Sequence, residues 1–123
     1  HMGGENAPPL KEIRIWQMKD TVDPRMKFIS LAELRERFGE PLGENYRAVY
    51  DGQLGTNDLD AIFERCNLDH PPGYTGYSLS ISDIVELYDE SGSAYHYVDR
   101  FGFQQIPFDT PEQDMGLTMS QSL

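Results

Sequence analysis

Short apolar runs alternate with polar turns along the chain, a pattern that predicts strands and short helices joined by tight loops. Residues 11–19 (KEIRIWQMK) alternate apolar and charged side chains, which predicts a strand running into a loop at Asp20. A second strand is predicted over 46–50, where β-forming residues end at Asp51-Gly52.

Three further strands are predicted near the C-terminal end. Residues 84–88 are strongly apolar, 89–92 form a turn and 94–98 return, so we expect a β-hairpin. Phe101, Phe103 and Gln105 then alternate in a last short strand.

Two helices are predicted, and local signals mark the ends of the first, over 31–38. Ser30 and Glu33 form a capping box, and Ile29 and Leu34 stand where a hydrophobic staple is found. Gly39 suits the left-handed residue after the last turn.

The second helix is predicted over 59–66, capped by Thr56, Asn57 or Asp58. Cys66 falls on its apolar stripe, where a structural role outweighs a nucleophilic one. Because Cys66 is the single cysteine, an internal disulfide and a cysteine-cluster zinc site are excluded.

This order of elements predicts an α+β domain with a mainly antiparallel sheet of four to five strands and two short helices packed on one face. A small β-barrel with peripheral helices is the alternative, because Phe101-Gly102-Phe103 could curl the sheet. We expect a tag scar and disordered lead at 1–9, a single domain at 10–108, and a disordered acidic tail at 109–123. Without a secretory leader or an apolar run of membrane-spanning length, a cytoplasmic location is expected.

The negative charge lies in one part of the chain. Residues 1–40 hold seven basic and seven acidic side chains, whereas 41–123 hold three arginines against fourteen acids, which accounts for the net charge of −11. Such a surface repels phosphate backbones and anionic lipid, so we expect no direct nucleic-acid or membrane binding, and basic protein partners become more plausible. Solubility alone is the other explanation of the acidic charge.

Catalytic and metal-binding patterns are weak. The histidines fit no zinc motif, and the glycines form neither a P-loop nor a dinucleotide fingerprint. The residue types of a hydrolytic triad are available in Ser80 or Ser82, His70 or His96, and Asp83 or Asp99. It lacks a nucleophile elbow and an oxyanion loop, so we expect no catalysis and no cofactor or metal.

Aromatic content is the remaining candidate. The last strands cannot bury tyrosines on both faces unless both faces are covered, so some are expected to be exposed. Exposed tyrosines rimmed by acids suit protein binding, while covering the edge of a small core is the other explanation. The candidate contact residues are Tyr74, Tyr77, Tyr88, Tyr95 and Tyr97.

Residues 77–106 (YSLSISDIVELYDESGSAYHYVDRFGFQQI) closely resemble the signature of the YodL-like domain. Residues 46–76 fit the upstream part of that pattern, and 11–19 resemble the opening that precedes it. Two positions depart from it, because Tyr77 stands where histidine is common and Arg100 where a small polar residue is common.

The signature positions divide on physical grounds into core residues and polar residues at strand ends. Leu79, Val98 and one or both phenylalanines are expected in the core, and Asp83 and Asp99 are interpreted as caps of backbone amides. The structural signature comprises Ser78, Ser80, Ser82, Asp83, Asp99, Phe101, Gly102 and Phe103.

The resemblance implies an intracellular bacterial domain, carried within larger multidomain proteins of mobile elements and without established enzymatic activity. We therefore expect a non-catalytic protein-interaction domain that uses the tyrosine-rich hairpin. The alternatives are an acidic mimic of nucleic acid that inhibits a host defence or DNA-processing enzyme, and a regulator of the actin-like cell-shape machinery.

Overall fold

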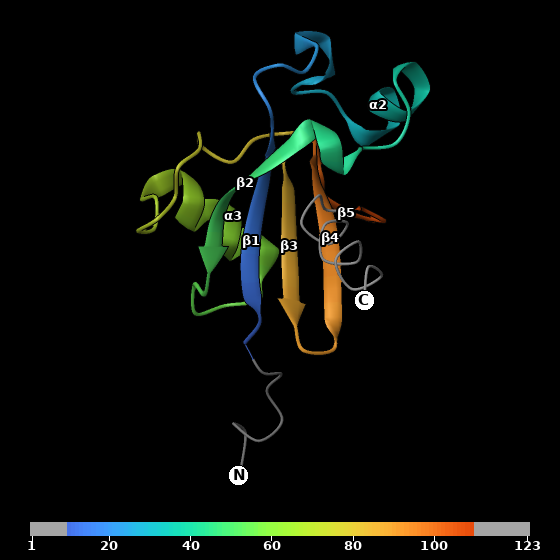
Figure 1. The fold of residues 1–123 in the computed structure, drawn as a ribbon. Helices are drawn as coiled ribbons and strands as arrows, with labels where there is room; N and C mark the ends of the chain where they lie inside the picture. Colours follow the sequence, from blue (N-terminus) through green and yellow to red (C-terminus); the bar gives the residue numbers. More distant parts are fainter. Residues whose placement is uncertain (1–9, 110–123) are drawn as a thin grey trace, which may run out of the picture.

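A computed structural model describes residues 10–109 of the chain (Figure 1). Five antiparallel strands form one sheet in the order β2-β1-β3-β4-β5. The strands are β1 (Glu12–Met18), β2 (Tyr46–Gly52), β3 (Ile84–Asp89), β4 (Gly92–Asp99) and β5 (Gly102–Ile106). The helices are α2 (Leu31–Arg37) and α3 (Leu59–Leu68), with 3-10 turns η1 (Pro24–Met26) and η2 (Gly43–Asn45). The expected α+β fold is confirmed, and the barrel is wrong because the edge strands β2 and β5 do not pair.

Both faces of the sheet carry a hydrophobic cluster. The α3-side cluster consists of buried side chains from four strands, α3 and the loop before β3: Ile13, Ile15, Val49, Tyr50, Ile62, Cys66, Leu79, Val85 and Val98. The α2-side cluster, on the other face, includes Trp16, Met18, Leu31, Leu34, Tyr46, Ile84, Tyr95, Tyr97, Ile106 and Phe108. The central strand β1 contributes to both clusters, as expected of a strand with neighbours on each side.

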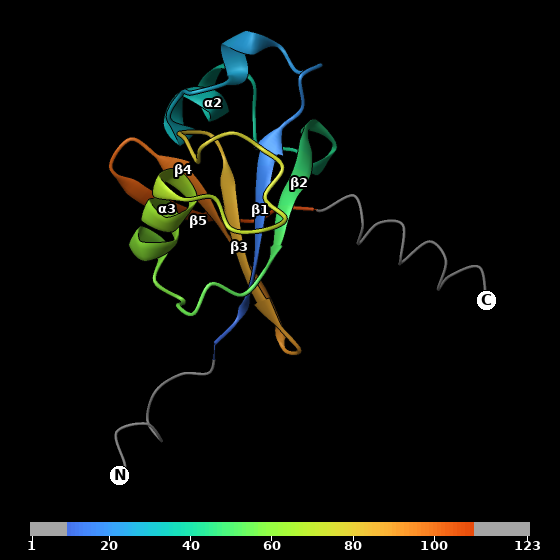
Figure 2. The same cartoon turned by 90° about the vertical axis from the view of Figure 1, so that its left-hand side faces the viewer.

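The expectation that both helices share one face needs a refinement. Helix α3 lies against one face, whereas α2 lies beyond the end of the sheet (Figure 2). Helix α2 buries Leu31 and Leu34 in the α2-side cluster, and the Leu31 N–H donates to Asp99 Oδ1 at 3.4 Å, close to the end of β4. Helix α2 has only two turns and one pair of buried leucines, so it is too short to cover a face of the sheet and instead covers the end of the α2-side cluster.

The predicted helix signals are present in part. The Glu33 carboxylate accepts from Arg37 instead of completing the capping box, and the Asp58 side chain at the start of α3 makes no capping hydrogen bond. The Glu33 N–H donates to Ser30 Oγ at 3.2 Å, and the Gly39 N–H donates to the Leu34 carbonyl at 2.9 Å with φ of 104°. In α3, Cys66 is fully buried, and burial raises the pKa of its thiol to about 11. This agrees with a structural role for Cys66.

One β-bulge adapts β2 to its neighbour. Ile15 pairs with Tyr50 but Trp16 pairs with Ala48, which leaves Val49 as the extra residue. Val49 and Tyr50 consequently both lie in the α3-side cluster.

Phe108, the last residue of the expected domain, is packed against the sheet. Phe108 is only 7% exposed, and its ring lies 5.7 Å from that of Trp16 and 5.3 Å from those of Tyr46 and Tyr95. Composition alone does not reveal this packing, because a single phenylalanine outside any periodic run fills a gap among three distant rings. The expected lead at 1–9 and almost all of the expected tail, 110–123, lie outside the described residues.

Candidate functional site

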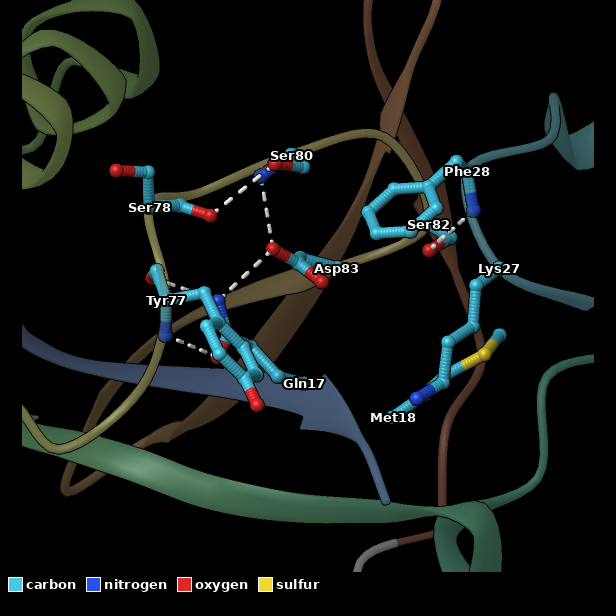
Figure 3. A pocket seen from close by; sticks show the side chains of 9 residues that line it. All are labelled: Gln17, Met18, Lys27, Phe28, Tyr77, Ser78, Ser80, Ser82 and Asp83. Carbon is cyan, nitrogen blue, oxygen red and sulfur yellow. Dashed lines mark hydrogen bonds between the residues drawn. The ribbon is translucent and has the colours of Figure 1, made fainter. Parts of the chain in front are cut away.

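A pocket of about 260 Å³ opens where β1 ends, between the segment 19–30 and the loop that precedes β3. Three separate stretches of chain line it, and Figure 3 shows their side chains. The lining residues are Gln17, Met18, Lys27, Phe28, Tyr77, Ser78, Ser80, Ser82 and Asp83.

Asp83 is the buried charge-bearing group of this pocket, with only 6% exposure. Its Oδ2 atom accepts two hydrogen bonds, from the Ser80 N–H at 2.8 Å and from Gln17 Nε2 at 3.1 Å. Its Oδ1 atom has no hydrogen-bond partner within residues 10–109, and Figure 3 shows this second oxygen turned away from both donors. Burial raises the pKa of the Asp83 carboxyl to about 7, against the opposing effects of these hydrogen bonds and of the Lys27 charge.

Two strained backbone positions border the pocket. Within the described part of the chain, Phe28 (φ 65°) and Ser82 (φ 86°) are the only non-glycine residues with positive φ. The Phe28 N–H donates to Ser82 Oγ at 3.1 Å, which joins the two walls, and the Ser82 carbonyl accepts from the Tyr46 hydroxyl at 2.8 Å. Strain of this kind gathers at functional sites, where the surrounding structure holds it in place.

The wall formed by the loop before β3 is held against β1 by Gln17. Its Oε1 accepts from the Tyr77 N–H at 3.0 Å, and its Nε2 donates to the Tyr77 carbonyl at 2.9 Å. Gly76 permits this approach, because a Cβ there would lie 2.1 Å from Gln17 Oε1 and 2.9 Å from Val49 Cβ.

The tyrosines expected to form one contact surface are not gathered. Tyr95 and Tyr97 are buried, and the Tyr97 hydroxyl donates to the Ile29 carbonyl at 2.8 Å, so the expectation that the hairpin exposes them is wrong. Both side chains face the α2-side cluster, which the segment before α2 and Phe108 cover. This cover comes from parts of the chain remote from the hairpin, so strand alternation does not reveal it.

The remaining three tyrosines are at least partly accessible but lie apart. Tyr77 is 69% exposed at the pocket, and the half-buried Tyr74 donates from its hydroxyl to the Tyr77 carbonyl at 2.6 Å. Tyr88 lies near the far end of β3, where its ring centroid is 4.5 Å from the Arg14 guanidinium carbon and its hydroxyl donates to Asp51.

Four signature residues, Ser78, Ser80, Ser82 and Asp83, line the pocket, and the other four lie at or near the β4–β5 turn. The capping interpretation is confirmed: Asp83 accepts from the Ser80 amide, and Asp99 Oδ1 accepts from the Arg100 amide at 2.8 Å. Leu79 and Val98 are in the core, and Phe103 meets Phe63 edge-on. Phe101 is 94% exposed, and Gly102 has φ of 94°. The signature thus contains both core and pocket residues.

Sequence reasoning missed an ion-pair network centred on a buried glutamate, on the α2-side face. Glu86 is 1% exposed, and it accepts from Trp16 Nε1 at 2.9 Å and from Ser93 Oγ at 2.7 Å. Arg14 lies 3.4 Å from Glu86 and 3.1 Å from Asp51. A lone glutamate inside the apolar run IVELY was the available signal, but its partners depend on the strand register.

The serines and histidines of the hydrolytic triad considered above have other partners. Ser82 Oγ accepts from the Phe28 amide, Ser80 Oγ donates to the Ser78 carbonyl, and His96 Nδ1 lies 3.2 Å from the Val85 carbonyl. His70 stacks on Tyr74 with ring centroids 4.5 Å apart. Within residues 10–109 there is no serine–histidine hydrogen bond, no cluster of three or more potential metal ligands, and no helix long and apolar enough to cross a membrane.

These features define a small α+β domain with an open antiparallel sheet and one strained pocket at its end. The sequence model of the YodL-like domain matches residues 12–108, and the chain belongs to the YodL-like domain family. Comparison with curated proteins and with solved structures gave no significant match.

Proposed function

We propose that this domain is a non-catalytic protein-interaction module that binds a segment of a partner protein at the pocket. The observation that carries this proposal is the pair of exposed aromatic side chains beside the pocket, Phe28 at 65% exposure and Tyr77 at 69%. Aromatic side chains that flank a cavity supply much of the binding energy at protein interfaces. We also propose, from the resemblance of its motifs, that the domain acts within a larger bacterial mobile-element protein.

The pocket replaces the tyrosine hairpin as the proposed contact surface. Its walls are held by the Gln17 and Ser82 hydrogen bonds, so a partner meets a largely preformed site and loses little free energy in ordering it.

The acidic-mimic alternative receives less support. A mimic of nucleic acid needs unpaired carboxylates spaced along one face, but several carboxylates here are in ion pairs. Asp51 and Glu86 pair with Arg14, and Asp89 pairs with Lys11 at 2.8 Å.

The test uses the full chain as bait in a cell extract of the source organism. A partner that binds through the pocket is retained by wild type and by Phe101→Ala, which removes an exposed aromatic away from the pocket, and is lost by the Phe28→Ala/Tyr77→Ala double variant. Thermal unfolding checks that all variants are folded.

The salt dependence of partner binding distinguishes the interaction module from the acidic mimic. Binding through aromatic anchors persists from low to physiological ionic strength, whereas binding through the acidic charge weakens steeply. A partner that the Phe28→Ala/Tyr77→Ala variant retains and that moderate salt releases would reject the proposal in favour of the mimic.

A further inference from the structure

We propose that the pocket takes the ammonium group of a lysine side chain of the partner, with Asp83 Oδ1 as its acceptor and Phe28 and Tyr77 beside it. This inference rests on the proposed function and specifies its chemistry. It starts from a carboxylate that is more than nine-tenths buried, lines a cavity and keeps one oxygen without a partner in the described chain.

The pocket favours a cation over an anion. The unused oxygen of this carboxylate can accept a hydrogen bond from a ligand in the pocket, and a positively charged donor gives the stronger bond. The Ser80 hydroxyl donates its hydrogen bond to the Ser78 carbonyl at 3.1 Å, so its oxygen remains available as an acceptor toward the ligand. Phe28 and Tyr77 line the same pocket as Asp83 (Figure 3), and aromatic rings attract cations. The net charge of −11 also attracts a basic partner.

The hydrogen-bond pattern favours lysine over arginine. A guanidinium binds carboxylates best through two parallel hydrogen bonds, one to each oxygen. Oδ2 of Asp83 is already used by Ser80 and Gln17, so only one oxygen is available. A compact ammonium, which acts as a point charge, suits this single acceptor.

The pocket's own lysine does not fill this role. Lys27 lines the pocket and its charge lowers the pKa of Asp83, but no ion pair joins the two within the described residues. The acceptor is therefore open to a cation from outside.

Binding a cation requires the ionised carboxylate, so protons compete with the ligand. Lys27 is the charged side chain that acts on Asp83, and the Asp83 charge in turn acts on Tyr46, Tyr74 and Tyr97. Burial raises the pKa of each of these tyrosines, so they remain neutral. With the Asp83 pKa at about 7, binding is expected to be about tenfold weaker at pH 6 than at pH 8.

The experiment titrates the folded chain with a blocked lysine, N-acetyl-lysine N-methylamide, and follows backbone amide shifts by NMR. The matched probe is the blocked norleucine, which keeps the apolar stem and lacks the ammonium. We expect the lysine probe at pH 8 to shift the amides of Tyr77, Ser80 and Ser82, and the norleucine probe to bind about tenfold more weakly or worse. The arginine analogue should fall between the two.

The variants identify the acceptor. Asp83→Asn should reduce lysine binding to the norleucine level, whereas Glu90→Gln, which removes one exposed carboxylate in the β3–β4 turn, should bind as wild type. His70→Gln should keep the pH dependence, because that histidine stacks on Tyr74 and does not contact Asp83. Equal binding of the lysine and norleucine probes, or undiminished lysine binding by a folded Asp83→Asn variant, would overturn the inference.

The two proposals can fail separately. A partner that is lost by the Phe28→Ala/Tyr77→Ala variant but kept by Asp83→Asn leaves the interaction module intact and rejects the lysine site. Conversely, lysine-specific binding together with a partner that every variant retains supports the site and rejects the pocket as the partner surface.

Discussion

Asp83 makes the stability of this domain depend on pH in an unusual direction. Most carboxylates have a lowered pKa in the folded state, so they stabilise proteins as the pH rises above their unfolded pKa. Here the folded state raises the pKa of Asp83 from 3.8 to about 7, mainly by burial. Between these two values the folded state binds more protons than the unfolded state, and the free energy of unfolding falls as the pH increases.

The magnitude follows from the shift. Each pKa unit corresponds to about 1.4 kcal/mol, so ionisation of Asp83 removes about 4 kcal/mol of stability between pH 4 and pH 8. The contribution of the neutral carboxyl is fully present below pH 3.8 and is largely lost once the pH has passed through 7. An asparagine at this position resembles the neutral carboxyl, because its oxygen can accept from both Ser80 and Gln17.

The assay is urea unfolding of wild type and Asp83→Asn from pH 4 to pH 8, followed by fluorescence of the single tryptophan, Trp16, which is buried. We expect similar stability near pH 4 and a growing advantage of the asparagine variant, up to about 4 kcal/mol at pH 8. The difference between the two curves removes the effects of other titrating groups, including Asp89, whose pKa the Lys11 hydrogen bond lowers. Parallel curves would refute a raised pKa at Asp83.

Three other substitutions test the packing, each measured by the free energy of unfolding. Phe108→Ala should cost about 3–5 kcal/mol because it empties a site among three rings, while Phe101→Ala at an exposed turn should stay within about 0.5 kcal/mol; equal effects would contradict the described end of the domain. Gly76→Ala should cost about 1–3 kcal/mol because the new Cβ overlaps its neighbours, and an unchanged unfolding midpoint would show that the loop lies farther from β1. Glu86→Ala should cost about 3 kcal/mol and alter the emission of Trp16, whose buried indole N–H loses its acceptor; unchanged emission would count against that hydrogen bond.

Local signals predicted the elements of this fold well. The capping box at Ser30 and the glycine at 39 defined α2 within one residue, and the turn at 89–92 placed the hairpin. These features depend on residues close in sequence, so propensity and hydrogen-bonding rules are sufficient to identify them.

The pocket could be predicted only in part. The amide-capping role of Asp83 follows from its place before an apolar strand, but the nearness of Gln17 and Phe28 depends on strand order and on two strained backbone positions. The burial of Tyr95 depends likewise on Phe108, which lies beyond the last strand. Such long-range contacts leave no periodic pattern in the sequence.

The strand order affects how the domain folds during its synthesis on the ribosome. Strands β3, β4 and β5 follow one another and form a contiguous meander, whereas β1 completes its pairing only when Glu12 meets Tyr88. During translation, β1 and β2 leave the ribosome long before β3, so one edge of β1 lacks its partner and Ile13 and Ile15 are incompletely covered in the meantime. A fragment that stops before residue 84 would keep that edge open, and we expect it to aggregate rather than fold.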